Sequence, residues 1–175
     1  MLLHICCGVC AAGAAAALLK EGHEVAGYFY NPNIHPQDEY LRRLETARKT
    51  ANHLGFRLEE GLYDTAAWEG AVAGLAGEPE GGRRCQACYR LRLEQTYRVM
   101  RSRGFDAFTT TLTISPHKKA QIINSIGVEI GGENFLARDF KKKDGFKQAV
   151  ERARRWELYR QDYCGCKYSR GGTGK

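Results

Sequence analysis

Short apolar runs alternate with segments of helical spacing along most of this chain, and that alternation limits the fold class. Strands are predicted at residues 2–5, 24–30, 57–62 and 107–113, with a last short strand at 134–137. Strand–helix–strand connections are right-handed and place successive strands in parallel. The chain is therefore predicted to adopt an α/β fold with a single open, mostly parallel sheet and flanking helices.

The helix predictions rest on apolar spacing and on residues that start or stop a helix. Gly55 and Gly104 end two of the helical patterns, and Ser115 followed by Pro116 begins another. The predicted helices cover residues 11–21, 38–54, 84–103, 116–130 and 145–157, and a short helix follows Asp64. Ligands of such sheets bind outside the carboxyl ends of the strands, so Cys6 and the turn after the fourth strand are expected at one rim.

The length and the apolar pattern also bear on the organisation of the chain. Its 175 residues are enough for one domain with a core of its own. We expect a single domain over residues 1–169 and a flexible C-terminal tail over the glycine-rich residues 170–175. No run approaches the ~20 apolar residues of a membrane span, and the N-terminal segment lacks the features of a signal peptide. A cytoplasmic protein without a membrane partner is expected.

All seven cysteines fall into three short clusters, whereas cysteines that only fill a core would be scattered. The clusters are Cys6, Cys7 and Cys10, then Cys85 and Cys88, and finally Cys164 and Cys166. In a reducing compartment, clustered cysteines indicate metal binding or catalysis more often than structural disulfides. The clusters therefore suggest a shared task for thiolate ligands or redox-active sulfurs.

The first two clusters have a spacing that suits a metal. Cys85 and Cys88 form a CxxC pair at a predicted helix start, where thiolates are favoured. Cys6 and Cys7 can face one centre only where the strand bends, and Gly8 supplies freedom for that bend. Four such thiolates would satisfy zinc or a [4Fe-4S] cluster, and spacing does not choose between them. The alternatives are thiol–disulfide exchange at the CxxC pair and plain buried cysteines on the strand.

The third cluster and Cys10 require separate interpretations. Cys164 and Cys166 flank a glycine, so they can close a small strained disulfide of the labile, catalytic kind. A second metal half-site, or two more ligands of the first centre, is the alternative. Cys10 lies one helical turn beyond Cys6 and Cys7, where a metal's open position or a substrate could lie.

Charge and polar motifs point to a polyanionic partner. The formal net charge is +7, which favours nucleic acid, although solvated helix faces explain such charge equally well. Residues 139–145 form a polar loop that could hold an RNA backbone, place Asp139 near the metal, or be a surface turn. The segment 159–163 mixes tyrosines with charge, which suits base stacking or interior packing.

Several motifs occur in the order known from one protein family. With these motifs the chain resembles the QueH-type epoxyqueuosine reductases up to about Ser169; the matching stretches are residues 4–8, 30–36, 40–43, 78–82, 85–93, 109–118, 138–145 and 159–166. The resemblance implies an adenine-nucleotide-hydrolase-like (HUP) fold without ATP chemistry. It also implies reduction of the epoxide of epoxyqueuosine at the wobble position of tRNA, with electrons from an unidentified donor.

The resemblance carries site roles over to particular residues. It implies a [4Fe-4S] cluster held by Cys6, Cys7, Cys85 and Cys88, and a redox-active pair, Cys164 and Cys166. A further iron beside the cluster is implied too, near Cys10, which stands where some members have Asp; Val9 stands where members usually have Pro. Asp139, Asp162 and His117 are the candidate proton donors. The competing readings are a zinc-stabilised RNA-binding module and a thiol–disulfide oxidoreductase.

Overall fold

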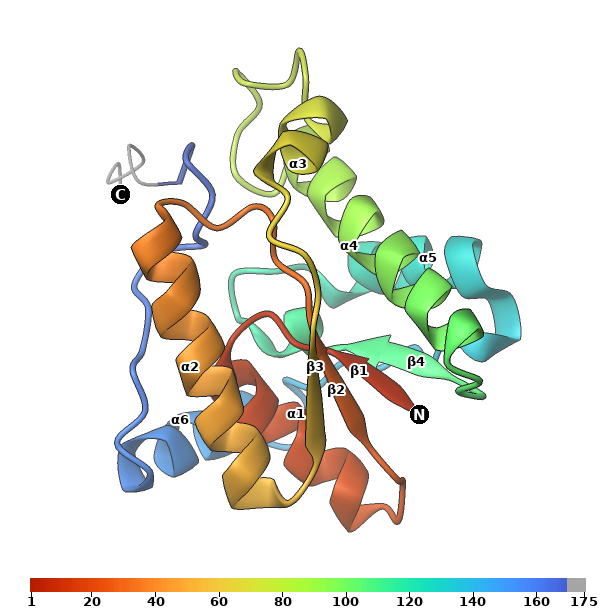
Figure 1. Ribbon diagram of the computed structural model, residues 1–175, viewed down its shortest axis with the longest axis vertical. Helices are drawn as coiled ribbons and strands as arrows, with labels where there is room; N and C mark the ends of the chain where they lie inside the picture. Colours follow the sequence, from red (N-terminus) through yellow and green to blue (C-terminus); the bar gives the residue numbers. More distant parts are fainter. Residues whose placement is uncertain (170–175) are drawn as a thin grey trace.

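Four short parallel strands form the centre of the computed structural model, which describes residues 1–169 (Figure 1). The strands are β1 (Leu2–His4), β2 (Ala26–Phe29), β3 (Arg57–Glu60) and β4 (Phe108–Thr110). They follow the order β3-β2-β1-β4 in one open sheet, and every strand pair among the described residues is parallel. The predicted α/β sheet is thus confirmed, while the predicted tail at 170–175 lies outside the described residues.

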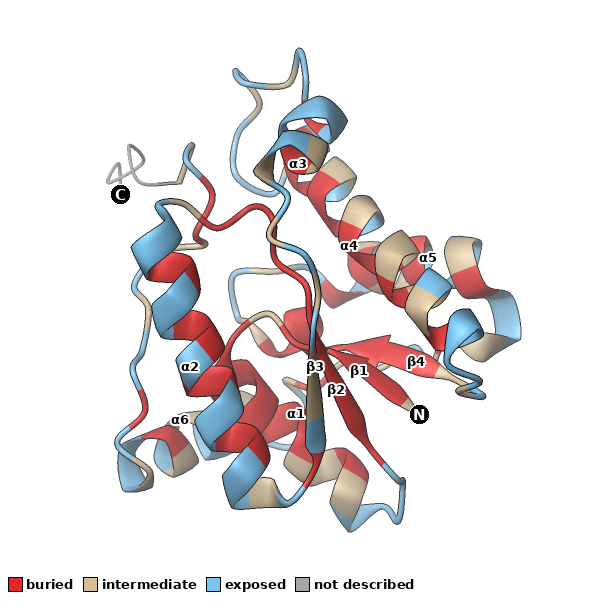
Figure 2. Cartoon of the chain, in the orientation of Figure 1, coloured by how far each residue is buried: buried red, intermediate tan, exposed pale blue. Residues whose placement is uncertain are grey.

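Helices cover both faces of this sheet. One face carries α1 (Gly8–Lys20), α2 (Gln37–Leu54) and α6 (Gly145–Arg155), and the other carries α4 (Arg83–Ser102) and α5 (Ala120–Gly131) (Figure 1). The short helix α3 (Thr65–Ala71) packs at the start of α4, and a 3₁₀ turn, η2 (Gly132–Asn134), follows α5. Adjacent strand residues face opposite ways, so Leu3 joins the core under α1 while Leu2 joins the core under α4. Figure 2 shows that buried residues line β1, β2 and β4 and the inner faces of the helices, whereas the edge strand β3 is exposed or intermediate.

The fourth strand is shorter than its β-branched sequence predicts. β4 ends at Thr110, because the hydroxyl of Thr110 accepts a hydrogen bond from the Leu112 amide at 3.1 Å and caps a 3₁₀ helix, η1 (Thr111–Ile114). The last predicted strand, at 134–137, is reduced to a single bridge between Phe108 and Phe135. The Thr110 hydroxyl, which bonds to the backbone two residues further on, therefore overrode the strand propensity.

The predicted helix start at Ser115 and Pro116 is wrong. Residues 115–119 form an irregular turn and α5 begins only at Ala120. The Lys141 ammonium donates to the carbonyl oxygens of Thr113 at 2.8 Å and Lys118 at 3.2 Å. These carbonyls thus bond to a distant side chain, and the turn is held open at the rim of the sheet.

Close contact between α1 and α2 explains the glycine after the first cysteines. A Cβ atom on Gly8 would lie 2.4 Å from both Cγ2 and the carbonyl oxygen of Thr46. Gly8 was expected to supply backbone freedom in a bend, but it lies in the first turn of α1, where the close approach of α2 leaves no room for a side chain. This contact fixes where α1 begins and therefore where the cysteines before it lie. Among the described residues, no helix combines the length and apolarity required to cross a bilayer.

Candidate metal and redox site

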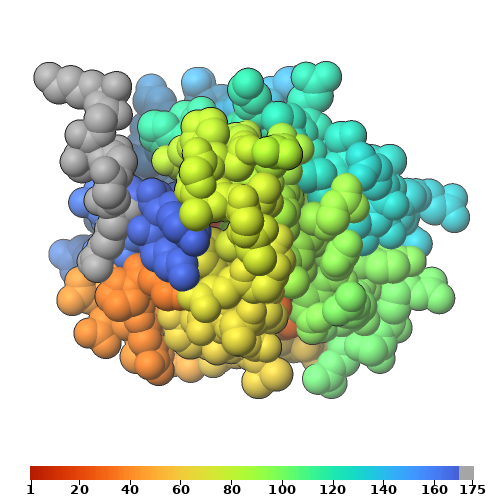
Figure 3. All heavy atoms as spheres, turned by 90° about the horizontal axis from the view of Figure 1, so that it is seen from above, coloured from red at the N-terminus to blue at the C-terminus, as the bar shows by residue number. Residues whose placement is uncertain are grey.

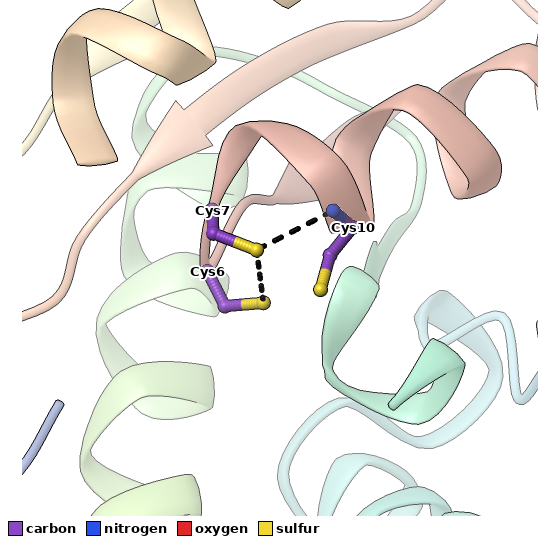
Figure 4. A group of neighbouring side chains, drawn as sticks. All are labelled: Cys6, Cys7 and Cys10. Carbon is purple, nitrogen blue, oxygen red and sulfur yellow. Dashed lines mark hydrogen bonds between the residues drawn. The ribbon is translucent and has the colours of Figure 1, made fainter. Parts of the chain in front are cut away.

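Three thiols meet where β1 passes into α1, at the carboxyl edge of the sheet. The sulfur atoms of Cys6, Cys7 and Cys10 all lie within 4.8 Å of one another, and those of Cys6 and Cys7 are 3.9 Å apart. Cys7 is the N-cap of α1, and its sulfur accepts a hydrogen bond from the Cys10 amide at 3.3 Å (Figure 4). The capping bond and the helical turn therefore bring three sulfurs into one small space.

Hydrogen bonds and neighbouring thiols favour one thiolate in this group. The Thr111 hydroxyl donates to the Cys6 sulfur at 3.2 Å. Hydrogen bonds from the thiols of Cys10 and Cys7 hold the pKa of Cys6 well below its usual range. The hydrogen bonds that the Cys10 thiol donates to Cys6 and Cys7, together with burial, raise the pKa of Cys10. One negative charge is thus stable among the three sulfurs, and further thiolates need a cation beside them. A set of sulfur donors of this kind can bind a metal ion.

The second cysteine pair lies on the first turns of α4. Cys85 and Cys88 are both buried, and the Gly81 amide donates to the Cys85 sulfur at 3.2 Å. Burial raises the pKa of both thiols, that of Cys88 to about 11. Neither belongs to the three-thiol group in the described part of the chain, although Cys6 packs against the apolar cluster that contains Cys85. The four-cysteine ligand set therefore stays a prediction.

A cavity of about 690 Å³ joins the first and third cysteine clusters. Cys6, Cys10 and Cys164 line it, together with the cationic side chains of Arg92 and Lys118. Sulfurs separated by more than 150 positions in the sequence thus share one cavity with positive charge. His117 and Asp162, two of the candidate proton donors, also contribute to its lining.

Two of the predicted site residues have other surroundings. Asp139 lines a second cavity of about 550 Å³. Its carboxylate accepts a hydrogen bond from the Lys141 amide at 3.1 Å and forms an ion pair with the Lys141 ammonium at 3.2 Å. Cys166 is buried in a cluster with Trp68 and Cys88. Cys164 and Cys166 therefore have different neighbours, one at the cavity and the other in the packing around α3 and α4.

Residues 159–166, termed the C-terminal strap, close one side of the main cavity. Figure 3 shows the C-terminal segment between the start of α2 and the region of α3. Arg43 of α2 donates to the backbone carbonyls of Tyr163 at 3.1 Å and Cys164 at 2.9 Å, and it pairs with Glu39 at 2.6 Å. The Tyr159 hydroxyl also donates to Glu39, at 2.8 Å. One buried ion pair thus anchors the strap.

Further hydrogen bonds tie the strap to the loop before α2. The Tyr163 hydroxyl donates to the carbonyl of His35 at 2.7 Å, and the His35 amide donates to the carbonyl of Gly165 at 2.7 Å. Gly165 has a φ of +105°, a conformation that favours glycine. The tyrosine hydroxyls of segment 159–163 thus bond within the protein, as the packing interpretation of that segment expects.

Removal of the Arg43 anchor is expected to loosen the strap. Arg43→Met leaves the buried carboxylate of Glu39 without its cation, which costs about 3–5 kcal/mol of folding stability. The double variant Arg43→Met with Glu39→Gln leaves no buried charge and should regain most of that stability without regaining the strap bonds. Hydrogen exchange of the 159–166 peptide should be more than about tenfold faster in both variants, a local loss of about 1.4 kcal/mol. Unchanged exchange in the double variant would contradict this role.

Sequence reasoning missed four residues at this site. Arg43, Arg92, Lys118 and Thr111 lie within the motif stretches 40–43, 85–93 and 109–118, but the sequence assigns none of them a role. Two of them left a local signal. Arg92 lies four residues after Cys88 and Arg43 four residues after Glu39, and that spacing puts each pair on one helix face. The contacts of Lys118 and Thr111, and those of Arg43 with the strap, are long-range and leave no local pattern.

Comparisons with known proteins agree with the motifs. A family model described as "Epoxyqueuosine reductase QueH" matches residues 1–171. A protein of that name from Streptococcus pyogenes serotype M1 is 39% identical over 180 residues, covering 97% of this chain and 69% of the relative. Proteins of the same name from Haemophilus influenzae and Thermotoga maritima are each 35% identical, covering 100% and 97% of this chain and 73% and 89% of the relatives.

Proposed function

Since the chain belongs to the QueH family of epoxyqueuosine reductases, we propose that it reduces the epoxide of epoxyqueuosine in tRNA to give queuosine. The observation that carries this proposal is the cavity shared by Cys6, Cys10 and Cys164, because it unites potential metal ligands with a potential redox thiol. The net charge of +7 supports tRNA as the partner, since phosphate contacts dominate nucleic-acid affinity.

The residues fit an iron–sulfur cluster. We propose that Cys6, Cys7, Cys85 and Cys88 hold a [4Fe-4S] cluster and that Cys10 faces a further iron beside it. The support is an all-sulfur donor set in which Cys7, Cys85 and Cys88 are buried and Cys6 is half-buried. A hydroxyl or an amide donates a hydrogen bond to the sulfurs of Cys6, Cys7 and Cys85. When bound, such a cluster transfers electrons one at a time, and an iron with an open position acts as a Lewis acid.

The strap cysteines balance the reaction. Loss of the epoxide oxygen as water breaks two carbon–oxygen bonds, leaves a carbon–carbon double bond, and consumes two electrons and two protons. Oxidation of the thiols of Cys164 and Cys166 to a disulfide releases two electrons and two protons, so one turnover is balanced. An external reductant then returns the pair to dithiol. Cys164 lines the cavity, which supports it as the sulfur nearer the substrate.

Polar side chains of the cavity would bind the substrate and move protons. His117, Lys118 and Asp162 line the cavity and are the proposed donors to the leaving oxygen. For Asp139, which lines the other cavity, we propose a positioning role. Its carboxylate faces the Lys141 ammonium, which in turn holds the carbonyls of Thr113 and Lys118. Asp139 would thereby fix the turn that presents His117 and Lys118.

An anaerobic assay on tRNA tests the proposed function. Protein purified without oxygen should contain iron and acid-labile sulfide, and with a chemical reductant it should convert epoxyqueuosine in tRNA to queuosine, as measured by mass spectrometry of the nucleosides. Zinc without sulfide, combined with tRNA binding and no conversion, would favour the zinc-stabilised RNA-binding module instead. Absence of any metal with reduction of a disulfide substrate would favour the thiol–disulfide oxidoreductase.

A further inference from the structure

A buried guanidinium on α4 has no carboxylate partner among the described residues. Arg92 is 3% exposed, its Nη2 donates to the side-chain oxygen of Asn31, and its Nε has no hydrogen-bond acceptor. Among the described residues, none of the ion pairs between basic and acidic side chains involves Arg92. A buried charge without a counter-charge is costly, at several kcal/mol, so this cation calls for an explanation.

The other two buried arginines have more hydrogen-bond partners. Arg43 is paired with Glu39 and also donates to two backbone carbonyls. Arg84, whose Nε likewise lacks an acceptor, donates to the carbonyl oxygens of Leu75, Ala76 and Glu78. Arg92, by contrast, donates to one oxygen, that of the neutral Asn31 side chain. A buried cation of this kind suits a site whose negative charge comes from something other than a carboxylate.

The surroundings of Arg92 identify that negative charge as cysteine thiolate. Arg92 follows Cys88 by four residues on α4, and the two side chains interact. The Asn31 side chain accepts a hydrogen bond from Arg92, and its Nδ2 donates one to the carbonyl of Ile5 at 2.9 Å. Asn31 therefore connects the guanidinium to the backbone just before Cys6. Arg92 and Cys6 then line the same cavity. The guanidinium thus lies between the first and second cysteine clusters.

We propose that Arg92 is the built-in counter-cation of the cysteine centre and raises the reduction potential of the cluster held there. The proposal rests on the proposed [4Fe-4S] function. Reduction adds an electron and makes the centre more negative, so a fixed positive charge nearby stabilises the reduced form more than the oxidised form. Burial strengthens this effect, because water does not screen the interaction. Arg92 is therefore a positioning and tuning residue that acts through the cluster.

Arg92→Met removes the charge while preserving much of the side-chain volume. The variant is expected to load iron and sulfide, with a reduction potential lowered by at least about 59 mV, a tenfold change in the ratio of reduced to oxidised cluster for a one-electron couple. Arg92→Lys keeps the charge and should stay within half of that shift. Arg90→Gln is the matched control on the same helix, because Arg90 is exposed and pairs with Glu129 at the surface. Its potential should equal that of the unsubstituted protein.

Anaerobic redox titration followed by visible absorbance, with iron and sulfide analysis, gives the readout. A potential of Arg92→Met equal to that of the unsubstituted protein overturns the proposal. The proposal is also overturned if Arg92→Lys lowers the reduction potential as far as Arg92→Met does. The hydrogen bond from the guanidinium to Asn31, rather than the charge, would then set the potential. If Arg92→Met does not fold, Arg92→Gln, which also removes the charge, takes its place with the same expected shift and the same criteria. Absence of iron and sulfide in the unsubstituted protein would instead refute the proposed function itself.

Discussion

Replacement of Cys85 by alanine is expected to remove both the iron–sulfur absorbance and the reductase activity. Cys85 is a proposed cluster ligand. Loss of a residue that only hydrogen-bonds to a metal ligand already lowers metal affinity by about 10- to 100-fold. The loss of a ligand should therefore reduce iron and sulfide content by at least about tenfold. Metal analysis, the visible spectrum and conversion of epoxyqueuosine in tRNA measure the outcome.

The adjacent residue provides the control for this variant. Gln86→Ala changes an exposed side chain within the same CxxC turn, where alanine favours the helix. It should retain the metal, the colour and the activity. Full conversion by Cys85→Ala without cluster absorbance would contradict the proposed mechanism, because turnover would then not depend on the centre.

Replacement of Cys164 by serine should separate turnover from metal binding. Cys164 lines the cavity but is not a proposed cluster ligand, so iron, sulfide and absorbance should match those of the unsubstituted protein. Steady-state conversion should fall by about 10²-fold or more, an effect on the scale of losing one positioned catalytic group, because a lone Cys166 cannot supply two electrons by forming the disulfide. The same variant should form no disulfide with Cys166 after turnover, as measured by mass spectrometry of alkylated peptides.

A surface variant of the same segment shows whether the effect is specific. Lys167→Ala breaks an exposed pair with Glu69, and exposed pairs contribute little to stability. It should therefore keep both the cluster and the activity. Loss of the cluster in Cys164→Ser would count against the assigned role, because Cys164 would then act as a ligand.

The sheet could be predicted from the sequence because its signals are local. Leu2 and Leu3 lie in the continuous apolar run of a strand covered on both faces, and Gly55 ends α2 in the left-handed conformation that glycine favours. The prediction failed at Thr110 and Pro116, where side chains and Lys141 compete for the backbone hydrogen bonds. Such competition depends on distant partners, so local propensity misses it.

The sequence indicated which cysteines gather at the cavity, but it indicated only some of the residues that surround them. Sequence spacing drew attention to the cysteines, and Cys6, Cys10 and Cys164 do meet at one cavity. Spacing did not show that Arg43 anchors the strap from 120 positions away, or that Asp139 lines a different cavity. These facts depend on how α2 and α6 pack against α1, which no single segment encodes.

The C-terminal strap has a consequence for the order in which the protein is built. Ribosomes synthesise a chain from its N-terminus, so the strap is the last of the described cavity walls to emerge. The segments that carry Cys6, Cys10 and Cys85 are already complete when Arg43 still lacks the carbonyls of Tyr163 and Cys164. The nascent protein therefore offers its thiols through a wider opening than the finished one, and a metal delivered during synthesis meets a less enclosed site.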